Sequence, residues 1–173
     1  MKTLIFKISI ADDDGTTCWR EVEAIPSQPL SKLAEGIVGA FGFDFDHAFG
    51  FYSNLDSNYL KSVKKYELFA DMDDDLSVGS TPSQSVKKTK MADAFSEFGQ
   101  VMLFVFDYGD EWRFLVEFTG CGEKEPRKRY PRTTNAEGKA PLQYPDWDEE
   151  ELEDGKPFGV NPRTGEIIRF TKN

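Results

Sequence analysis

Residues 104–118 read FVFDYGDEWRFLVEF, and this stretch constrains the fold more than any other part of the chain. Two runs with aromatic residues at alternate positions meet at a Tyr-Gly-Asp centre, which is the pattern of a β-hairpin. Trp112 and Phe114 share one face of the second strand. Phe104 and Phe106 must then face the same core from the first strand.

The length of the loop sets the register of this hairpin. A loop of residues 108–110 places Phe106 opposite Trp112. A shorter loop of residues 109–110 would place Phe106 opposite Arg113 and send the aromatic side chains of one strand into water. We therefore predict the three-residue loop, with its glycine supplying a positive φ for a bulge.

The hairpin also supports a family resemblance. Its DYGD motif, residues 107–110, followed by Trp112, resembles the central signature of the Ri-plasmid open-reading-frame-three-like proteins. The resemblance spans most of the chain, including Trp19, Arg20, Pro26, Leu30, Leu33, 40–43, His47, Phe51, 130–132 and 138–141. This family occurs on plasmids, beside insertion elements and in many microbial genomes, and has no established activity. The resemblance thus supports a shared fold and implies no reaction.

Two departures from the family pattern bear on metals. Many relatives have histidine two residues after the tryptophan, where this chain has Phe114. Many also have cysteines after the Tyr-Pro-Arg stretch, where this chain has Thr133 and no later cysteine. Such residues would be ligands for zinc or iron. We therefore expect no metal and no cofactor in this member.

Composition limits the classes of partner. The 173 residues have 31 acidic and 21 basic side chains, for a net charge of -10. This balance argues against generic binding to nucleic acid or anionic membranes and fits a basic partner. Lys7 and the acids of 12–14 interrupt the first apolar run too early for a signal peptide. No apolar stretch is long enough to cross a bilayer, so we expect a cytoplasmic protein with no membrane contact.

The first part of the chain predicts strand, strand, helix, strand. Alternating apolar residues over 4–10 and the run 18–25 predict two strands. Residues 30–41 follow helical spacing up to Gly42, which predicts the end of the helix. Residues 49–52 predict the third strand. This order opens a β-grasp, the ubiquitin-like arrangement, so we predict an α+β fold with a further helix, a long aromatic β-hairpin and a loop-rich C-terminal tail.

We expect one domain over residues 1–173. Its predicted parts are the ββαβ half, 1–53; an irregular excursion, 54–90; a helix followed by the hairpin, 91–119; and a loop-rich tail with a final strand, 120–173.

The tip of the hairpin and one histidine are the candidates for chemistry. Asp107, Asp110 and Glu111 could bind a divalent cation or share a proton. In the alternative interpretation, Asp107 bonds the loop backbone as an Asx-type turn while the other two acids are solvated. His47 is the single histidine of the chain. It could be a general base or a ligand, or a hydrogen-bonded structural residue.

A basic cluster follows the hairpin. Residues 127–132 read RKRYPR, and Arg127 and Arg129 are its candidates for phosphate contacts. The acids of residues 146–154 could instead neutralise the cluster within the same molecule.

The sequence favours a non-catalytic module that binds a protein partner of basic character, through Asp107, Tyr108 and Asp110 at the hairpin tip and through the acidic tail. We expect no enzymatic activity. A first alternative is a hydrolase that uses His47 with the hairpin carboxylates, which requires these groups to converge in one pocket. A second alternative is a nucleic-acid-associated accessory protein that uses residues 127–132.

Overall fold

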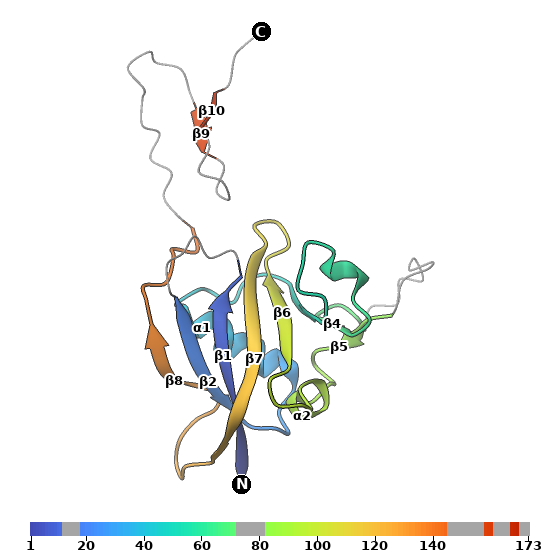
Figure 1. Ribbon diagram of the computed structural model, residues 1–173, viewed down its shortest axis with the longest axis vertical. Coiled ribbons are helices and arrows are strands. Elements are labelled where there is room, and N and C mark those ends of the chain that lie inside the picture. The colour runs from blue at the N-terminus through green and yellow to red at the C-terminus, as the bar shows by residue number, and fades with distance from the viewer. Residues whose placement is uncertain (12–17, 72–81, 145–157, 161–166, 170–173) are drawn as a thin grey trace. The chain divides into compact units, whose positions relative to one another are not determined.

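Eight strands form one sheet in the computed structural model, which describes residues 1–11, 18–71 and 82–144 together with the strand segments 158–160 and 167–169. The order across the sheet is β5-β4-β3-β6-β7-β1-β2-β8 (Figure 1). The strands of this sheet are β1 Lys2–Ile10, β2 Trp19–Ala24, β3 Phe49–Tyr52, β4 Lys65–Glu67, β5 Gln84–Ser85, β6 Val101–Phe106, β7 Trp112–Glu123 and β8 Arg132–Glu137. The helical elements are α1 Leu30–Ala40, the 3-10 turn η1 Tyr59–Lys61 and α2 Met91–Ala94.

The predicted β-grasp is wrong. Neighbouring strands pair antiparallel throughout this sheet except β4 and β5, which pair parallel. A ubiquitin-like β-grasp sets its first strand beside a parallel strand, whereas β1 lies between β2 and β7 and is antiparallel to both. The described helices contain far fewer residues than the eight strands of the sheet, so the fold is β-rich rather than α+β. The order of strands and helix along the chain was not enough to predict the fold, because that order does not determine which strands pair.

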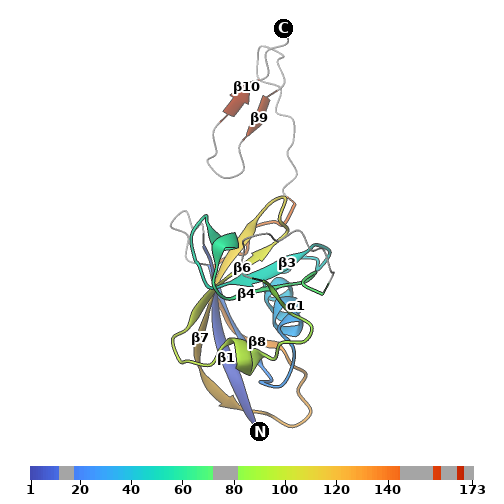
Figure 2. The same cartoon turned by 90° about the vertical axis from the view of Figure 1, so that its right-hand side faces the viewer.

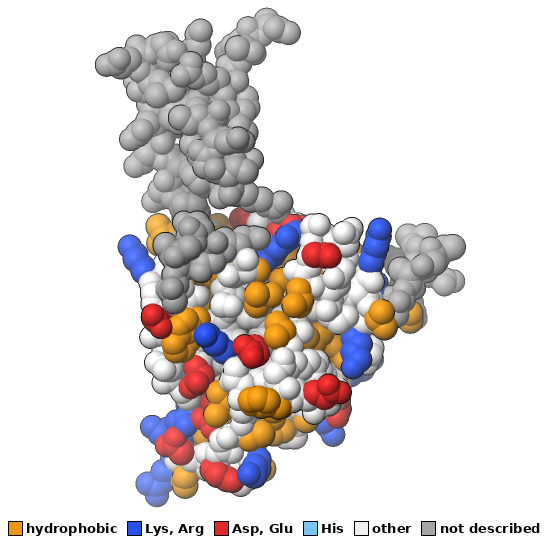
Figure 3. Space-filling model, in the orientation of Figure 1, with side chains coloured by type: hydrophobic (Ala, Val, Ile, Leu, Met, Phe, Trp, Pro, Cys, Tyr) orange, Lys and Arg blue, Asp and Glu red, His pale blue; other side chains and the backbone are white. Residues whose placement is uncertain are grey.

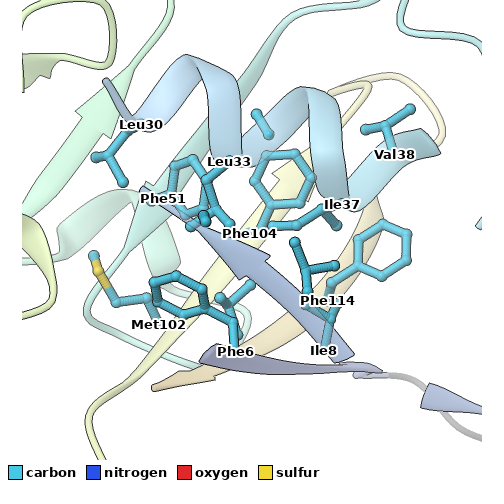
Figure 4. Close-up of a cluster of buried hydrophobic side chains, with 14 of the residues drawn as sticks. Phe6, Ile8, Leu30, Leu33, Ile37, Val38, Phe51, Met102, Phe104 and Phe114 are labelled. Carbon is cyan, nitrogen blue, oxygen red and sulfur yellow. The ribbon is translucent and has the colours of Figure 1, made fainter. Parts of the chain in front are cut away.

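One face of the sheet is covered by α1 (Figure 2). Apolar residues at helical spacing turn one side of α1 toward the sheet, and Leu30, Leu33 and Ile37 are completely buried there. Figure 4 shows these side chains in one cluster with Phe51 of β3 and with Phe104 and Phe114 of the hairpin. The helix ends before Gly42, whose φ of +77° gives the left-handed backbone that commonly follows a helix.

The predicted loop-rich tail contains more strand than expected. β7 continues to Glu123, and β8 then pairs antiparallel with β2. The Pro131 ring just before β8 packs on α1, because a Cβ added at Gly36 would lie 2.6 Å from its Cγ. The sequence RTTNAE of β8 lacks the alternating apolar residues that identify strands. Its strand conformation therefore depends on the pairing with β2.

The chain divides into two units, Met1–Pro141 and Leu142–Asn173. The second unit contains β9 Phe158–Val160 and β10 Ile167–Arg169, which pair antiparallel. β10 lies where a final strand was predicted, while the acids of 146–154 lie outside the described residues. Within the part of the chain that the structure describes, no helix is long and apolar enough to span a bilayer.

Candidate functional site

The predicted register of the hairpin is confirmed. β6 and β7 pair with Phe106 opposite Trp112. Trp112 is partly buried against the core under α1, where its ring centroid lies 4.8 Å from that of Phe43. Residues 107–111 connect the two strands and are called the hairpin tip below; the tip is the yellow loop that joins β6 and β7 in Figure 1.

Asp107 organises the hairpin tip. Its Oδ1 accepts hydrogen bonds from the backbone N–H groups of Gly109, at 2.9 Å, and Asp110, at 3.4 Å. Its own N–H donates to the carbonyl oxygen of Ala48 at 2.9 Å, which joins the tip to the start of β3. This geometry is the Asx-type turn considered from the sequence. The predicted glycine bulge is wrong, because Asp107 and Glu111 have the positive φ values, 58° and 50°, rather than Gly109.

His47 lies beside the hairpin tip, on the connection from α1 to β3. Its Nε2 is 3.5 Å from Oδ2 of Asp107, and its Nδ1 is 2.8 Å from Oδ1 of Asp46. The ring stands nearly perpendicular to that of Phe106, with 6.1 Å between the centroids. The His47 side chain is 42% exposed. The hydrolase hypothesis required His47 and a hairpin carboxylate to converge, and the structure brings His47 and Asp107 together at the surface.

The surroundings of His47 favour its protonated form. The hydrogen bond to Asp46 raises the pKa of His47 above its ordinary value of 6.5, and the negative charges of Asp107 and Asp110 act in the same direction against partial desolvation. A general base must be neutral to accept a proton. The His47 ring lies between the carboxylates of Asp46 and Asp107, and these contacts link the α1–β3 connection to the hairpin tip.

Tyr108 connects the tip to the sheet face opposite α1. Its hydroxyl lies 2.8 Å from the hydroxyl of Tyr52, which donates to Oε1 of Glu67 at 2.7 Å. Burial raises the pKa of both tyrosine hydroxyls above their ordinary value, so both stay protonated. A Cβ at Gly50 would lie 2.7 Å from the Tyr52 hydroxyl oxygen, so glycine is needed there to make room for the hydroxyl pair.

Glu111 is held on the same side of the sheet. Its Oε1 accepts a hydrogen bond from the hydroxyl of Tyr59 at 3.0 Å, and its Oε2 lies 2.8 Å from Nη2 of Arg113. The Arg113 guanidinium also lies over the Tyr59 ring, 5.5 Å from its centroid. Like charges that lie close together repel, and Arg113 pairs with the Glu111 carboxylate beside Asp107.

The basic cluster is partly neutralised by acids other than those predicted. Arg132 Nη2 lies 2.6 Å from Oε2 of Glu23, which is buried, and it also contacts Glu125. The hydrogen bond from Arg132, together with its charge, lowers the pKa of Glu125 below its ordinary value. Arg127 and Arg129 are exposed. The acids of 146–154, which the sequence offered as neutralising partners, lie outside the described residues.

No group of three or more histidine, cysteine, aspartate or glutamate side chains that could hold a metal ion occurs among the described residues. The three acids at the tip do not converge, since Asp107 bonds the loop, Glu111 pairs with Arg113 and Asp110 is exposed. Purification of the protein without stoichiometric zinc or iron stays a prediction.

From the sequence we did not identify four residues whose side chains form hydrogen bonds around His47, Tyr108 and Glu111. They are Asp46, Tyr52, Tyr59 and Glu67. Tyr52 had a detectable signal, because it alternates out of phase with the buried Phe49 and Phe51 and so belongs to the other face of β3. The contacts of Tyr59 and Glu67 arise between segments far apart in the chain and had no local signal.

Comparison with known proteins agrees with the family suggested by the hairpin. Residues 2–144 match the plasmid pRiA4b ORF-3-like proteins, so the chain belongs to this family. The matched residues contain the whole candidate site. No curated protein matches the chain.

A solved structure shares the fold. It is the crystal structure of a protein of unknown function from Methanosarcina mazei Go1, with a TM-score of 0.59 and 24% sequence identity. The match covers 78% of this chain and 69% of that one. At this identity the likeness concerns the fold alone.

Proposed function

We propose that this protein is a non-catalytic binding module whose contact surface is the hairpin tip together with the connection that contains His47. The observation that supports this proposal is that both oxygens of the Asp107 carboxylate contact groups of the protein itself. One of its oxygens bonds the loop backbone and the other faces His47, whose second ring nitrogen is hydrogen-bonded to Asp46. The groups suited to catalysis thus hold the surface in one shape, which reduces the entropy lost on binding.

The proposed partner is a protein segment rich in lysine or arginine. Tyr108 and Phe45 are 38% and 41% exposed at this end of the sheet, and exposed Asp110 lies on the tip beside Tyr108. Aromatic rings can hold cationic side chains over their faces, and aspartates attract them over longer distances. The net charge of -10 adds a general attraction for a basic partner.

The hydrolase alternative has one observation in its favour, the approach of His47 Nε2 to Asp107 at 3.5 Å. Against it stand the contacts of both ring nitrogens with carboxylates, which raise the pKa of His47 and so make neutral imidazole, the form that accepts a proton, less favourable. We therefore retain the hydrolase as the second candidate. The nucleic-acid alternative has the exposed Arg127 and Arg129 in its favour, but Arg132 is paired with Glu23 and Glu125 and the net charge of the chain is -10.

Two experiments test the proposal: a cross-link from the hairpin tip that identifies the partner, and then a charge reversal at the tip. A photo-reactive amino acid at position Tyr108 should cross-link the full chain to a defined protein, and the same group at the exposed Phe98 should not. Binding of that protein should then be measured for Asp110→Arg and for Glu97→Arg. Both acids are exposed, and Glu97 precedes β6 at the end away from the tip, so the two variants change the charge equally at different places.

The proposal expects Asp110→Arg to weaken binding at least about tenfold, the effect of roughly 1.4 kcal/mol, with Glu97→Arg near wild type. Equal losses in both variants would indicate a non-specific charge effect and would refute a binding surface at the tip.

A further inference from the structure

The sheet face opposite α1 carries an ordered pattern of side chains over β6, β7, β1 and β2. One row across the strands runs through Trp19, Ser9, Leu115 and Leu103, which are successive register partners. Trp19 and Leu115 are half-buried and line a hollow in this face. Figure 3 looks onto the face and shows hydrophobic side chains among polar ones across its middle. Apolar side chains of this kind on one sheet face favour contact with another surface.

The next row across the same strands is charged. Lys7 is the register partner of Glu21 on one side and of Glu117 on the other, and Glu117 pairs with Val101 of β6. Lys7 also lies over the Trp19 ring, with its Nζ 5.2 Å from the ring centroid. Positive and negative charges therefore alternate along this row, beside the apolar row.

From these two rows we infer that the face is a homodimer interface, in which two copies of the chain pack sheet against sheet. A two-fold axis running between β1 and β7, parallel to the strands, exchanges the positions of these two strands. It therefore sets Lys7 of each copy over Glu117 of the other copy. The same operation sets Leu115 over Ser9, so this apolar side chain fills space beside a smaller one. Leu103 is completely buried against Tyr52 and Tyr59 of its own chain, so the apolar contact across the axis comes from Leu115 and Trp19.

A second copy fits this face better than a partner of a single charge sign. A basic segment would place like charges against Lys7, and an acidic one would place them against Glu21 and Glu117. A two-fold interface uses the same patch on both subunits and must be self-complementary, which the alternating row fulfils. Two sheets packed face to face in this way form a sandwich, whose core lies between their apolar rows.

Sedimentation equilibrium on the full 173-residue chain and its charge-swapped variants tests this inference. Wild type should have twice the chain mass of 19.7 kDa. Lys7→Glu and Glu117→Lys should each weaken the dimer at least about tenfold, because like charges then meet across the axis. The double variant Lys7→Glu with Glu117→Lys should dimerise again, since every pair is restored with its sign reversed.

A matched pair on the same two strands provides the control. Lys2 and Glu123 are register partners of β1 and β7, with their charged atoms 3.8 Å apart, and they lie outside the two rows. Lys2→Glu therefore introduces the same repulsion within one chain but should leave the dimer intact. A monomeric wild type would overturn the inference. Dimers that persist in both Lys7→Glu and Glu117→Lys would overturn it as well. So would a loss of the dimer in Lys2→Glu as large as the loss in those two variants.

Discussion

The two faces of the β6–β7 hairpin use alternate residues of the same strands, yet they hold the protein together differently. Toward α1 the hairpin presents Phe104, Phe106 and Phe114, each completely buried among other rings and aliphatic side chains. On the other face, near the tip, it meets Tyr52 and Tyr59, whose hydroxyls bond carboxylates. Apolar burial stabilises the first face. The second face depends on hydrogen bonds and ion pairs as well. Because successive residues of a strand point to opposite faces, the same two strands are stabilised in different ways on their two faces.

The largest effect is expected on the face toward α1. Phe104→Ala should cost about 3–5 kcal/mol in free energy of unfolding, the range for removing a buried aromatic side chain. The Phe104 ring lies 4.7 Å from Phe51 and 6.0 Å from Phe114, centroid to centroid, and is completely buried. Denaturant melts measure the loss. Phe98→Ala is the control, because Phe98 is 78% exposed and its removal should cost less than about 0.5 kcal/mol. A similar loss in both variants would contradict the assignment of this face as the core.

On the opposite face, a smaller effect is expected from removing one oxygen atom. Tyr52→Phe should cost about 1.5–3 kcal/mol, because the Tyr52 hydroxyl bonds the Glu67 carboxylate and the Tyr108 hydroxyl in a buried place. Tyr66→Phe is the matched control. Tyr66 is buried on the α1 side, and its hydroxyl makes no hydrogen bond that the described residues show, so its loss should be close to zero. If the two variants have equal stability, the proposed contrast between the faces fails.

At the tip itself, we expect Asp107→Asn to reduce stability more than Asp110→Asn, by about 1 kcal/mol, the scale of one charge-assisted hydrogen bond. Asparagine tolerates the left-handed backbone at this position, so the change tests the carboxylate and its contact with His47. Chemical denaturation of the two variants gives the comparison.

Glu111→Gln is the control for charge repulsion at the tip. It should be destabilising, because Glu111 pairs with Arg113. If Asp107→Asn and Glu111→Gln both increase stability, the two carboxylates are a repelling pair, and the hydrolase candidate gains support over the binding module.

The smallest effect is expected from pH. The pKa of His47 in the folded protein is raised above 6.5, so its contacts stabilise the fold fully below about pH 6.5 and lose this contribution as pH rises through the folded-state pKa. NMR titration of the ring protons should give a single histidine pKa above 6.5. Asp46→Asn should lower that pKa, because the hydrogen bond to Asp46 is the largest cause of the shift. A His47 pKa below 6.5 would mean that neutral imidazole is the ordinary state and would favour a catalytic role.

The fold could be predicted where the pattern was local. Alternating apolar residues located β1, β3, β6 and β7, and helical spacing located α1. The aromatic pattern also determined the pairing of β6 with β7, because a slip of one residue would have exposed one strand's rings. β8 was missed because its polar sequence has no strand pattern of its own. The β-grasp prediction failed because pairing between distant strands depends on which partners compete for each strand.

The candidate site divides in the same way. The sequence by itself contained the Asx-type turn at Asp107 as one of two interpretations, since a side chain and a loop backbone within four residues can make that contact without help from the rest of the protein. The tertiary structure alone decided that His47 reaches Asp107 and that Tyr52 joins Glu67 to Tyr108. These contacts form only after β3 has paired with β6, which brings side chains from separate segments of the chain to one end of the sheet. No local pattern encodes such a meeting, because its energy comes from the packed sheet as a whole.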